Sequence, residues 1–351
     1  MTLPSLVAAA MFVGVIIYAV CAGADFGSGF YDLTAGAGKS GAELRTLVDH
    51  SIGPVWEANH VWLIYVLVMW WTGFPKAFAA AMTTLFIPLM LALTGIVLRG
   101  SSFALRKYAP TFRQARLFGA VFAGSSLITP FFFGTVVGGI ASGRLPASGY
   151  GDRVGSWINP TSLVGGCLAV TTCVFLAGIF LTADAARAGD TTLGERLRRR
   201  TLAVGALSGV IVFVGLFPVL HDAPRLSRGL LHGGFPLLMV AAIAGATTLI
   251  MLYRRSYFLA RCFGVAAVTA VVAGWGVGQY PWMLVDQLTI EGAAGAPSTL
   301  AALLVVVALA VVLVLPALVY LFRLSQSGQT VPTNRRSLSP TKPLATPLEA
   351  R

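Results

Sequence analysis

A few ionisable and polar residues lie within or at the ends of long apolar runs of this sequence. They are Asp25, Glu57, Asn59, His60 and Arg99. A charged group at membrane depth costs about 3 kcal/mol on insertion scales, and such a group is functional by default. A carboxylate near an arginine at this depth predicts a route for protons or ions. The alternative that stays open is a static ion pair that holds the helices together.

The spacing of these residues indicates how they could act together. Glu57 and His60 are three residues apart and therefore share one face of a helix, and Asn59 can extend a hydrogen-bonded chain from them. If successive apolar runs cross a membrane in alternating directions, Asp25, Glu57 and Arg99 come to one depth near the inner side. For Asp25 a second alternative stays open, namely that it caps the end of its helix at the interface.

The composition shows which solvent surrounds the elements that carry these residues. Of the 351 residues, 56% are hydrophobic and 11% are charged, whereas a soluble domain has about 25% charged residues. Lipid is the solvent that explains the missing charge. The net charge of +12 lies mostly in short clusters between apolar runs. This distribution indicates topology and contact with anionic lipid, and no nucleic-acid partner is expected.

A transmembrane helix needs roughly 20 mostly apolar residues. The sequence contains nine candidate spans, at 3–31, 53–73, 77–98, 117–142, 161–183, 202–220, 230–252, 257–279 and 299–323. The predicted fold class is therefore an all-α integral membrane protein with about nine transmembrane helices. Residues 1–323 are expected to form one transmembrane domain. Residues 324–351, which are rich in Ser, Thr, Pro and Arg, are expected to form a disordered cytoplasmic tail.

The basic residues predict the orientation of the chain. Of the 25 Lys and Arg residues, 20 lie on the same side as the tail when the loops are taken alternately. Because cytoplasmic loops carry the excess of basic residues, this side is cytoplasmic. Nine spans then put the N-terminus outside.

Other chemistries find little support in the residue types. A membrane cytochrome with two haems needs facing histidines at matched depth, but His60 and His232 belong to opposite sides. The four cysteines form no CxxC pair, and no metal site is expected. The glycine-rich segment 23–29 lies in an apolar helix without a βαβ pattern, so its small residues are expected to permit close helix contact.

Several separate segments, in the right order, resemble subunit II of the cytochrome bd quinol oxidases. They are residues 23–29 (Gly-Ala-Asp-Phe-Gly-Ser-Gly), residues 53–63 (Gly-Pro-Val-Trp-Glu-Ala-Asn-His-Val-Trp-Leu), Arg99, and residues 274–281 (Gly-Trp-Gly-Val-Gly-Gln-Tyr-Pro). Trp56, Glu57 and Asn59 are the most specific part. The resemblance covers residues 1 to about 323.

The resemblance implies the architecture and the partners. It implies two four-helix bundles plus one peripheral helix, in a multi-pass protein of the bacterial plasma membrane. It implies a heterodimer with subunit I, which carries the haem b and haem d-type groups, and it allows for a small accessory transmembrane subunit. The complex would use quinol to reduce oxygen to water, with protons taken from the cytoplasm. This chain would not be catalytic alone and would hold no cofactor apart from a structural quinone.

The resemblance also implies residue roles. Glu57 would lie on a proton route toward the oxygen-reducing site, with Asp25, Asn59 and His60 as further members and with Trp56 and Arg99 in support. Some family members have Asp and Gly where this sequence has Glu57 and Ala58, and glutamine where it has His60. Glutamate keeps the titratable group but changes its reach, so the detailed path differs.

An ion-coupled secondary transporter remains the alternative function. That class is expected to show an inverted repeat and broken helices near the midplane. The sequence shows no convincing internal repeat, and its charged positions lie off-centre.

Overall fold

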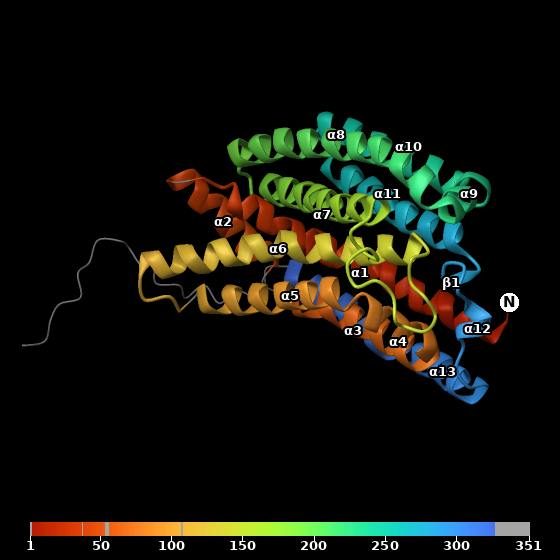
Figure 1. Cartoon of the computed structure of the whole chain (residues 1–351). Coiled ribbons are helices and arrows are strands. Elements are labelled where there is room, and N and C mark those ends of the chain that lie inside the picture. The colour runs from red at the N-terminus through yellow and green to blue at the C-terminus, as the bar shows by residue number, and fades with distance from the viewer. Residues whose placement is uncertain (1, 37, 53–55, 107, 327–351) are drawn as a thin grey trace, which may run out of the picture. The chain divides into compact units, whose positions relative to one another are not determined.

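The computed structural model describes residues 2–36, 38–52, 56–106 and 108–326 (Figure 1). Within these ranges, the side chains of Ile52, Trp56, Glu57, Ala58 and Phe112, and of several residues beyond Val314, lie outside the description. The elements are α1 (Leu3–Leu33), α2 (Lys39–Ile52), α3 (Trp56–Gly73), α4 (Pro75–Thr84), α5 (Phe86–Arg106), α6 (Phe112–Ala141), α7 (Pro160–Arg187), α8 (Thr191–Asp222), α9 (Pro224–His232), α10 (Phe235–Tyr253), α11 (Tyr257–Gln279), β1 (Trp282–Leu284), β2 (Leu288–Thr289), α12 (Ile290–Ala293) and α13 (Pro297–Gln326).

The helices confirm the predicted class. Eight helices of the described residues are long and apolar enough to cross a membrane, and a ninth span results if the bent pair α3 and α4 is taken as one. The only sheet among the described residues is the antiparallel pair β1–β2. The division into two four-helix bundles and a peripheral helix stays a prediction.

The predicted span 77–98 is wrong in its boundaries. The chain bends by 117° between α3 and α4, and α5 then carries the span from Phe86 to Arg106. Two prolines explain the breaks. Pro75 is in the first turn of α4, and Pro88 has no N–H to donate to the carbonyl of Thr84, so α4 cannot continue into α5.

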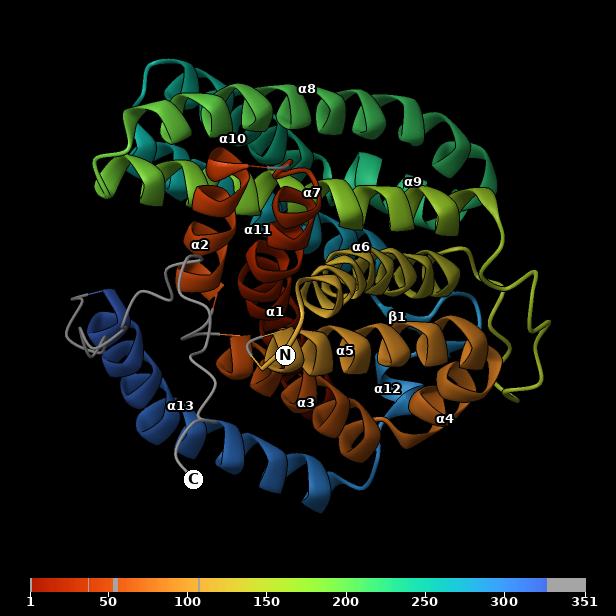
Figure 2. The same ribbon diagram turned by 90° about the vertical axis from the view of Figure 1, so that its left-hand side faces the viewer.

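Helix α1 lies in the middle of the first compact unit, which extends to Ala308. It packs against α3, α6, α7 and α11, and Figure 2 shows it surrounded by these helices. Further contacts join α5 to α6, α6 to α7, α7 to α8, and α10 to α11. Residues of α1 can therefore be enclosed by helices from both halves of the unit. The second unit begins at Leu309, within α13.

Helix α2 was not predicted, because its mean hydropathy is too low for a span. It is amphipathic: Leu44 and Val48 are buried, and Lys39 and Glu43 are exposed. It lies at the end of the unit opposite the N-terminus (Figure 1), which is the end predicted to face the cytoplasm. The predicted span 230–252 also begins too early, since His232 ends α9 and α10 begins at Phe235.

Candidate functional site

Asp25 of α1 and Arg99 of α5 form a buried ion pair. Arg99 Nη2 donates to Asp25 Oδ1 at 2.7 Å, and Nη1 donates to Oδ2 at 3.1 Å. Asp25 is 4% exposed and Arg99 is 2% exposed. The planar guanidinium matches the two carboxylate oxygens, a geometry that gives strong charge-assisted hydrogen bonds. Each charge therefore compensates the other where water is excluded.

Arg99 has further partners on two helices, α1 and α6. Its Nε donates to Ser126 Oγ of α6 at 2.9 Å, and its Nη2 also donates to the carbonyl oxygen of Asp25 at 3.2 Å. Its Cζ lies 4.9 Å from the ring centre of Phe26 and 5.0 Å from that of Phe122. Aromatic faces attract a guanidinium, most strongly when it is desolvated. These contacts hold the cation of the pair in one orientation.

The predicted span 77–98 stops just before Arg99, which is wrong, and so is the alternative that Asp25 caps α1. Helix α5 continues for seven residues beyond Arg99, and α1 continues for eight residues beyond Asp25. Both residues lie well inside their helices. The apolar runs underestimated the helix lengths because polar residues at the inner ends of α1 and α5 also take helical conformation.

Small residues of α1 explain how Asp25 becomes enclosed. A Cβ on Gly27 would lie 1.8 Å from the carbonyl oxygen of Cys173 in α7, and a Cβ on Gly29 would lie 2.3 Å from Ser126 Cβ in α6. The backbone of α1 is therefore in direct contact with both neighbouring helices. This confirms the prediction that the small residues of 23–29 permit close helix contact.

Asn59 and His60 of α3 lie beside the same stretch of α1. Asn59 is 3% exposed, and its Nδ2 donates to the carbonyl oxygen of Cys21 at 3.4 Å. The His60 ring is 6.3 Å from the ring of Phe26, which in turn contacts Arg99. The structure thus brings four predicted residues, Asp25, Asn59, His60 and Arg99, into one neighbourhood. Trp56 and Glu57 begin α3, but their side chains are among those that the structure does not describe.

A second group of charges lies two helical turns farther along α1 and α5. Arg106 Nη1 donates to Asp32 Oδ2 at 3.0 Å, and its Nη2 donates to Asp49 Oδ1 of α2 at 3.0 Å. Arg45 of α2 adds an ion pair to Asp32 at 3.6 Å. Asp32 is buried, whereas the Asp49 side chain is 41% exposed. The group therefore connects the buried carboxylate of α1 with the surface at the α2 end.

Sequence reasoning missed this second group, although a signal was present. Asp25 and Asp32 are seven residues apart, and so are Arg99 and Arg106. Seven residues are about two turns, so each pair lies on one face of its helix. Two carboxylates on α1 thus match two arginines on α5, as they can when both helices run in the same direction.

The histidines outside this neighbourhood make local contacts. The Nδ1 atoms of His50, His221 and His232 each lie 2.8 Å from the carbonyl oxygen four residues earlier. Throughout the part of the chain that the structure describes, no three His, Cys, Asp or Glu side chains come together as they would around a metal ion.

The segment 274–281 has a structural role at the other end of the unit. Gln279 accepts a hydrogen bond from Trp275 Nε1 at 3.0 Å and donates to the carbonyl oxygen of Trp282 at 3.3 Å. Nearby, Asp222 accepts hydrogen bonds from Arg144 and from Thr161. The hydrogen bond to Asp222 raises the pKa of Arg144 above its usual value. These contacts join loops and helix ends at the end of the unit that lies away from Asp25.

Comparisons with known proteins identify a family that this chain matches. The family model for cytochrome bd terminal oxidase subunit II matches residues 3–325. A Bacillus subtilis protein named cytochrome bd ubiquinol oxidase subunit 2 is 27% identical over 206 residues, which are 58% of this chain and 57% of that protein. Cytochrome bd-I ubiquinol oxidase subunit 2 of Escherichia coli is 28% identical over 228 residues, or 59% of this chain and 56% of that protein. The chain thus spans just over half the length of these curated relatives.

A solved structure shares the fold. It is a chain of the bd oxidase from Geobacillus thermodenitrificans, with a TM-score of 0.76 and 22% identity, and the match covers 93% of this chain and 100% of that one. At this identity the likeness shows the arrangement of the helices. Since the family model matches nearly all of the sequence, the chain belongs to the cytochrome bd terminal oxidase subunit II family.

Proposed function

We propose that this chain is subunit II of a quinol:oxygen oxidoreductase and that it provides part of a proton route from the cytoplasm to the oxygen-reducing site. The observation that carries the proposal is the Asp25–Arg99 pair, buried between α1, α5 and α6. Ionisable residues at membrane depth mark ion and proton routes. Family membership and the names of the relatives supply the reaction, in which quinol reduces oxygen to water.

The proposed route begins at the α2 end of the unit. Asp49 is reached from the surface, and Arg106 links it to the buried Asp32. Asp25 lies about 10 Å farther along α1, at 1.5 Å per residue. Ser28, between the two, donates to the carbonyl oxygen of Asp25 at 2.5 Å. Protons would move along this line as the carboxylates are protonated and deprotonated in turn, without movement of a helix.

Glu57 is assigned a titratable step of the route, because it precedes Asn59 and His60 in the first turn of α3. Asn59 and His60 lie beside residues 21–26 of α1, where they can extend hydrogen bonds toward Asp25. Arg99 holds the Asp25 carboxylate in place through two hydrogen bonds, and Trp56 is assigned a supporting role. The haem groups belong to the partner subunit I, so no electron-transfer step is assigned to this chain.

The proposal includes an orientation and an assembly. The α2 end faces the cytoplasm of a bacterium, as do the C-terminal residues, and the N-terminus lies outside. Residues 1–323 form the membrane domain, and residues 324–351 form a tail. Subunit I is the obligatory partner, and the assembly allows for a small accessory transmembrane subunit.

The decisive experiment isolates the membrane complex through a tag on this chain and measures its absorption spectrum and oxygen consumption. We expect a haem-bearing partner to co-purify and to consume oxygen when quinol is supplied. A colourless protein without a partner would overturn the proposal. Ion uptake by that protein alone in liposomes would then favour the secondary transporter.

A further inference from the structure

We infer that the start of α8 and the turn between α10 and α11 form a binding site for the headgroup of an anionic phospholipid. The two segments are joined by polar contacts: Arg198 Nη1 donates to the carbonyl oxygen of Tyr253 at 3.4 Å, and Arg255 Nη2 lies 3.4 Å from Glu195 Oε2. The inference concerns a surface that the proposed proton route does not use.

The charges at this site are unbalanced. Arg198, Arg199 and Arg255 all pair with the single carboxylate of Glu195, at 2.7, 3.0 and 3.4 Å. Arg254 is exposed and has no carboxylate partner among the described residues. One carboxylate cannot neutralise four guanidinium groups. The site therefore keeps a net positive charge that a phosphate would complement.

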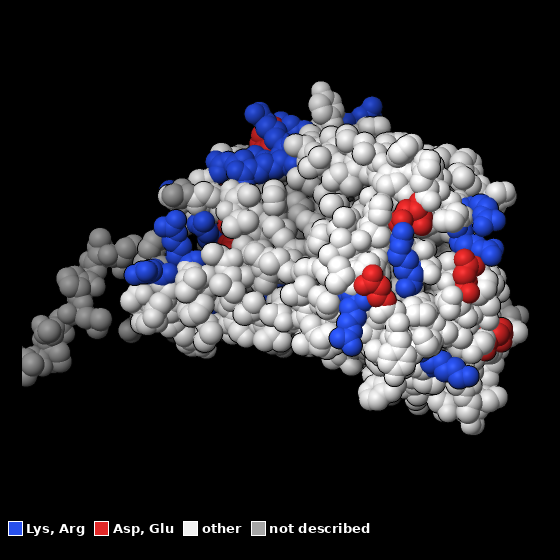
Figure 3. Space-filling model, in the orientation of Figure 1, with Lys and Arg blue, Asp and Glu red and all other residues white. Residues whose placement is uncertain are grey.

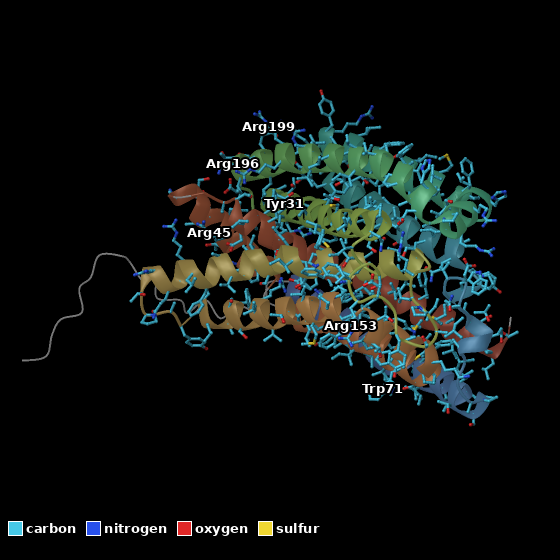
Figure 4. The ribbon with its side chains drawn as sticks, in the orientation of Figure 1. Tyr31, Arg45, Trp71, Arg153, Arg196 and Arg199 are labelled. Atoms are coloured by element: carbon cyan, nitrogen blue, oxygen red, sulfur yellow. The ribbon has the colours of Figure 1, made fainter. Side chains whose placement is uncertain are left out.

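The cations are also accessible. The Arg199 side chain is 77% exposed and that of Arg255 is 67% exposed. Figure 4 shows Arg196 and Arg199 projecting from the start of α8, and Figure 3 shows Lys and Arg gathered over this end of the helix. Arg255 has φ +61°, a conformation that glycine adopts at least cost. An arginine is thus held where the turn alone would favour glycine.

The surroundings place the site at the level of lipid headgroups. On the membrane side of the cluster, large apolar side chains are exposed, namely Leu207 and Val210 of α8, Ile243 and Ile250 of α10, and Leu259 of α11. Tyr253 and Phe258, which flank the turn, are 73% and 77% exposed. Exposed aromatic rings are typical of the membrane interface. A phospholipid can therefore place its phosphate on the arginines and its acyl chains along this apolar surface.

The occupant we assign is a lipid of the surrounding membrane rather than a soluble anion, because the cations and the exposed apolar surface are continuous. A soluble phosphate would use only the cations. A zwitterionic lipid would bring its own positive charge to a site that already has an excess, so an anionic lipid is favoured.

The test uses the full chain with its co-purifying partner, reconstituted in bilayers that contain spin-labelled phosphatidylglycerol or phosphatidylcholine. We expect a higher relative association constant for phosphatidylglycerol. The double substitution R199Q/R255Q should lower this preference roughly tenfold. The matched control, R113Q/R116Q, removes two exposed cations near the start of α6 at the same end of the unit, and it should keep the preference.

A second variant tests the site by an expected gain in lipid preference. Glu195→Gln removes the carboxylate that pairs with Arg198, Arg199 and Arg255, so it should raise the preference for phosphatidylglycerol. An unchanged preference in R199Q/R255Q and in Glu195→Gln would overturn the assignment. An equal loss of preference in R199Q/R255Q and in R113Q/R116Q would show that diffuse surface charge attracts the lipid, and it would overturn the assignment of a defined site. Displacement of the labelled lipid by millimolar inorganic phosphate would identify a soluble-anion site and would likewise refute the lipid.

Discussion

At the scale of single residues, the central feature is an ion pair in which each buried charge compensates the other. Asp25 and Arg99 are almost fully buried and joined by two hydrogen bonds between their side chains. A buried pair of this kind contributes little net stability, but removing one partner leaves an uncompensated charge. The pair can be a static link or a member of a proton route, and its variants distinguish the two.

Arg99→Met should destabilise the protein by about 3–5 kcal/mol, because it leaves the Asp25 carboxylate buried without a cation. The double substitution Asp25→Leu/Arg99→Met removes both charges and should recover most of that loss. If the pair belongs to a proton route, the double variant should be stable yet slow in oxygen reduction. Thermal unfolding and oxygen consumption of the purified complex measure the two effects. Normal turnover in the stable double variant would leave only the static link.

Glu57→Gln should slow oxygen reduction while the complex still assembles, since the amide keeps the shape but cannot titrate. The loss should be on the order of a hundredfold, the low end for loss of a positioned proton-transfer group. Glu43→Gln is the control, because Glu43 is an exposed carboxylate of α2. Equal turnover of the two fully assembled variants would contradict the role of Glu57.

At the scale of elements, helix α1 owes its position to its glycines. Gly27 touches the backbone of α7, and Gly29 touches Ser126 of α6. The same contacts bring Ser126 to Arg99, which it helps to orient. The packing of α1 and the geometry of the charge pair therefore depend on each other.

Gly27→Ala should separate α1 from α7, because the new Cβ would overlap the carbonyl oxygen of Cys173. Overpacking typically costs about 1–3 kcal/mol, and contact with backbone leaves little room to relax. Gly124→Ala in α6 is the matched control, because nothing lies within 4 Å of its Cβ position. It should be neutral or slightly stabilising, since alanine favours helix by about 1 kcal/mol over glycine. Equal yields and melting temperatures of the two variants would contradict the close contact.

At the scale of the whole molecule, the charges are distributed unevenly between the two ends. At the end with α2 and the start of α8, clustered arginines share carboxylates, as Arg198 and Arg199 share Glu195, whereas at the opposite end Arg144 pairs with Asp222 and Arg225 pairs with Asp286. Figure 3 shows Lys and Arg gathered over the start of α8. From the positive-inside rule, the end with the clustered arginines is predicted to face the cytoplasm. This orientation also puts Asp49 and Arg106 on the side from which the proposed route takes protons.

Deletion of residues 330–351 should leave assembly and oxygen consumption unchanged. The composition of this segment predicts disorder, and the family match ends at residue 325. Co-purification of the partner and the rate of oxygen consumption are the measurements. Loss of the partner on deletion would show that the tail takes part in assembly.

The sequence alone determined the class of this protein, the approximate number of its spans and the neighbourhood of its charges. Hydropathy is a property of local segments, and a helix in lipid must satisfy its own backbone, so apolar runs predict spans directly. The same logic failed at Leu85, where α4 ends and α5 begins because Pro88 has no N–H to donate to the carbonyl of Thr84. It also shortened α1 and α5, since apolar length does not reveal where a helix continues into a polar region.

Only the tertiary structure decided which charges meet. Asp25 and Arg99 are 74 residues apart, as are Asp32 and Arg106, and hydropathy does not specify which faces of two helices pack together. That choice depends on the contacts of Gly27 and Gly29 with α7 and α6. It depends equally on α2, which brings Asp49 to Arg106 although its sequence predicts no span. Pairing between distant helices is decided by packing, because the free energy of the pair is available only once the helices that carry it are in place.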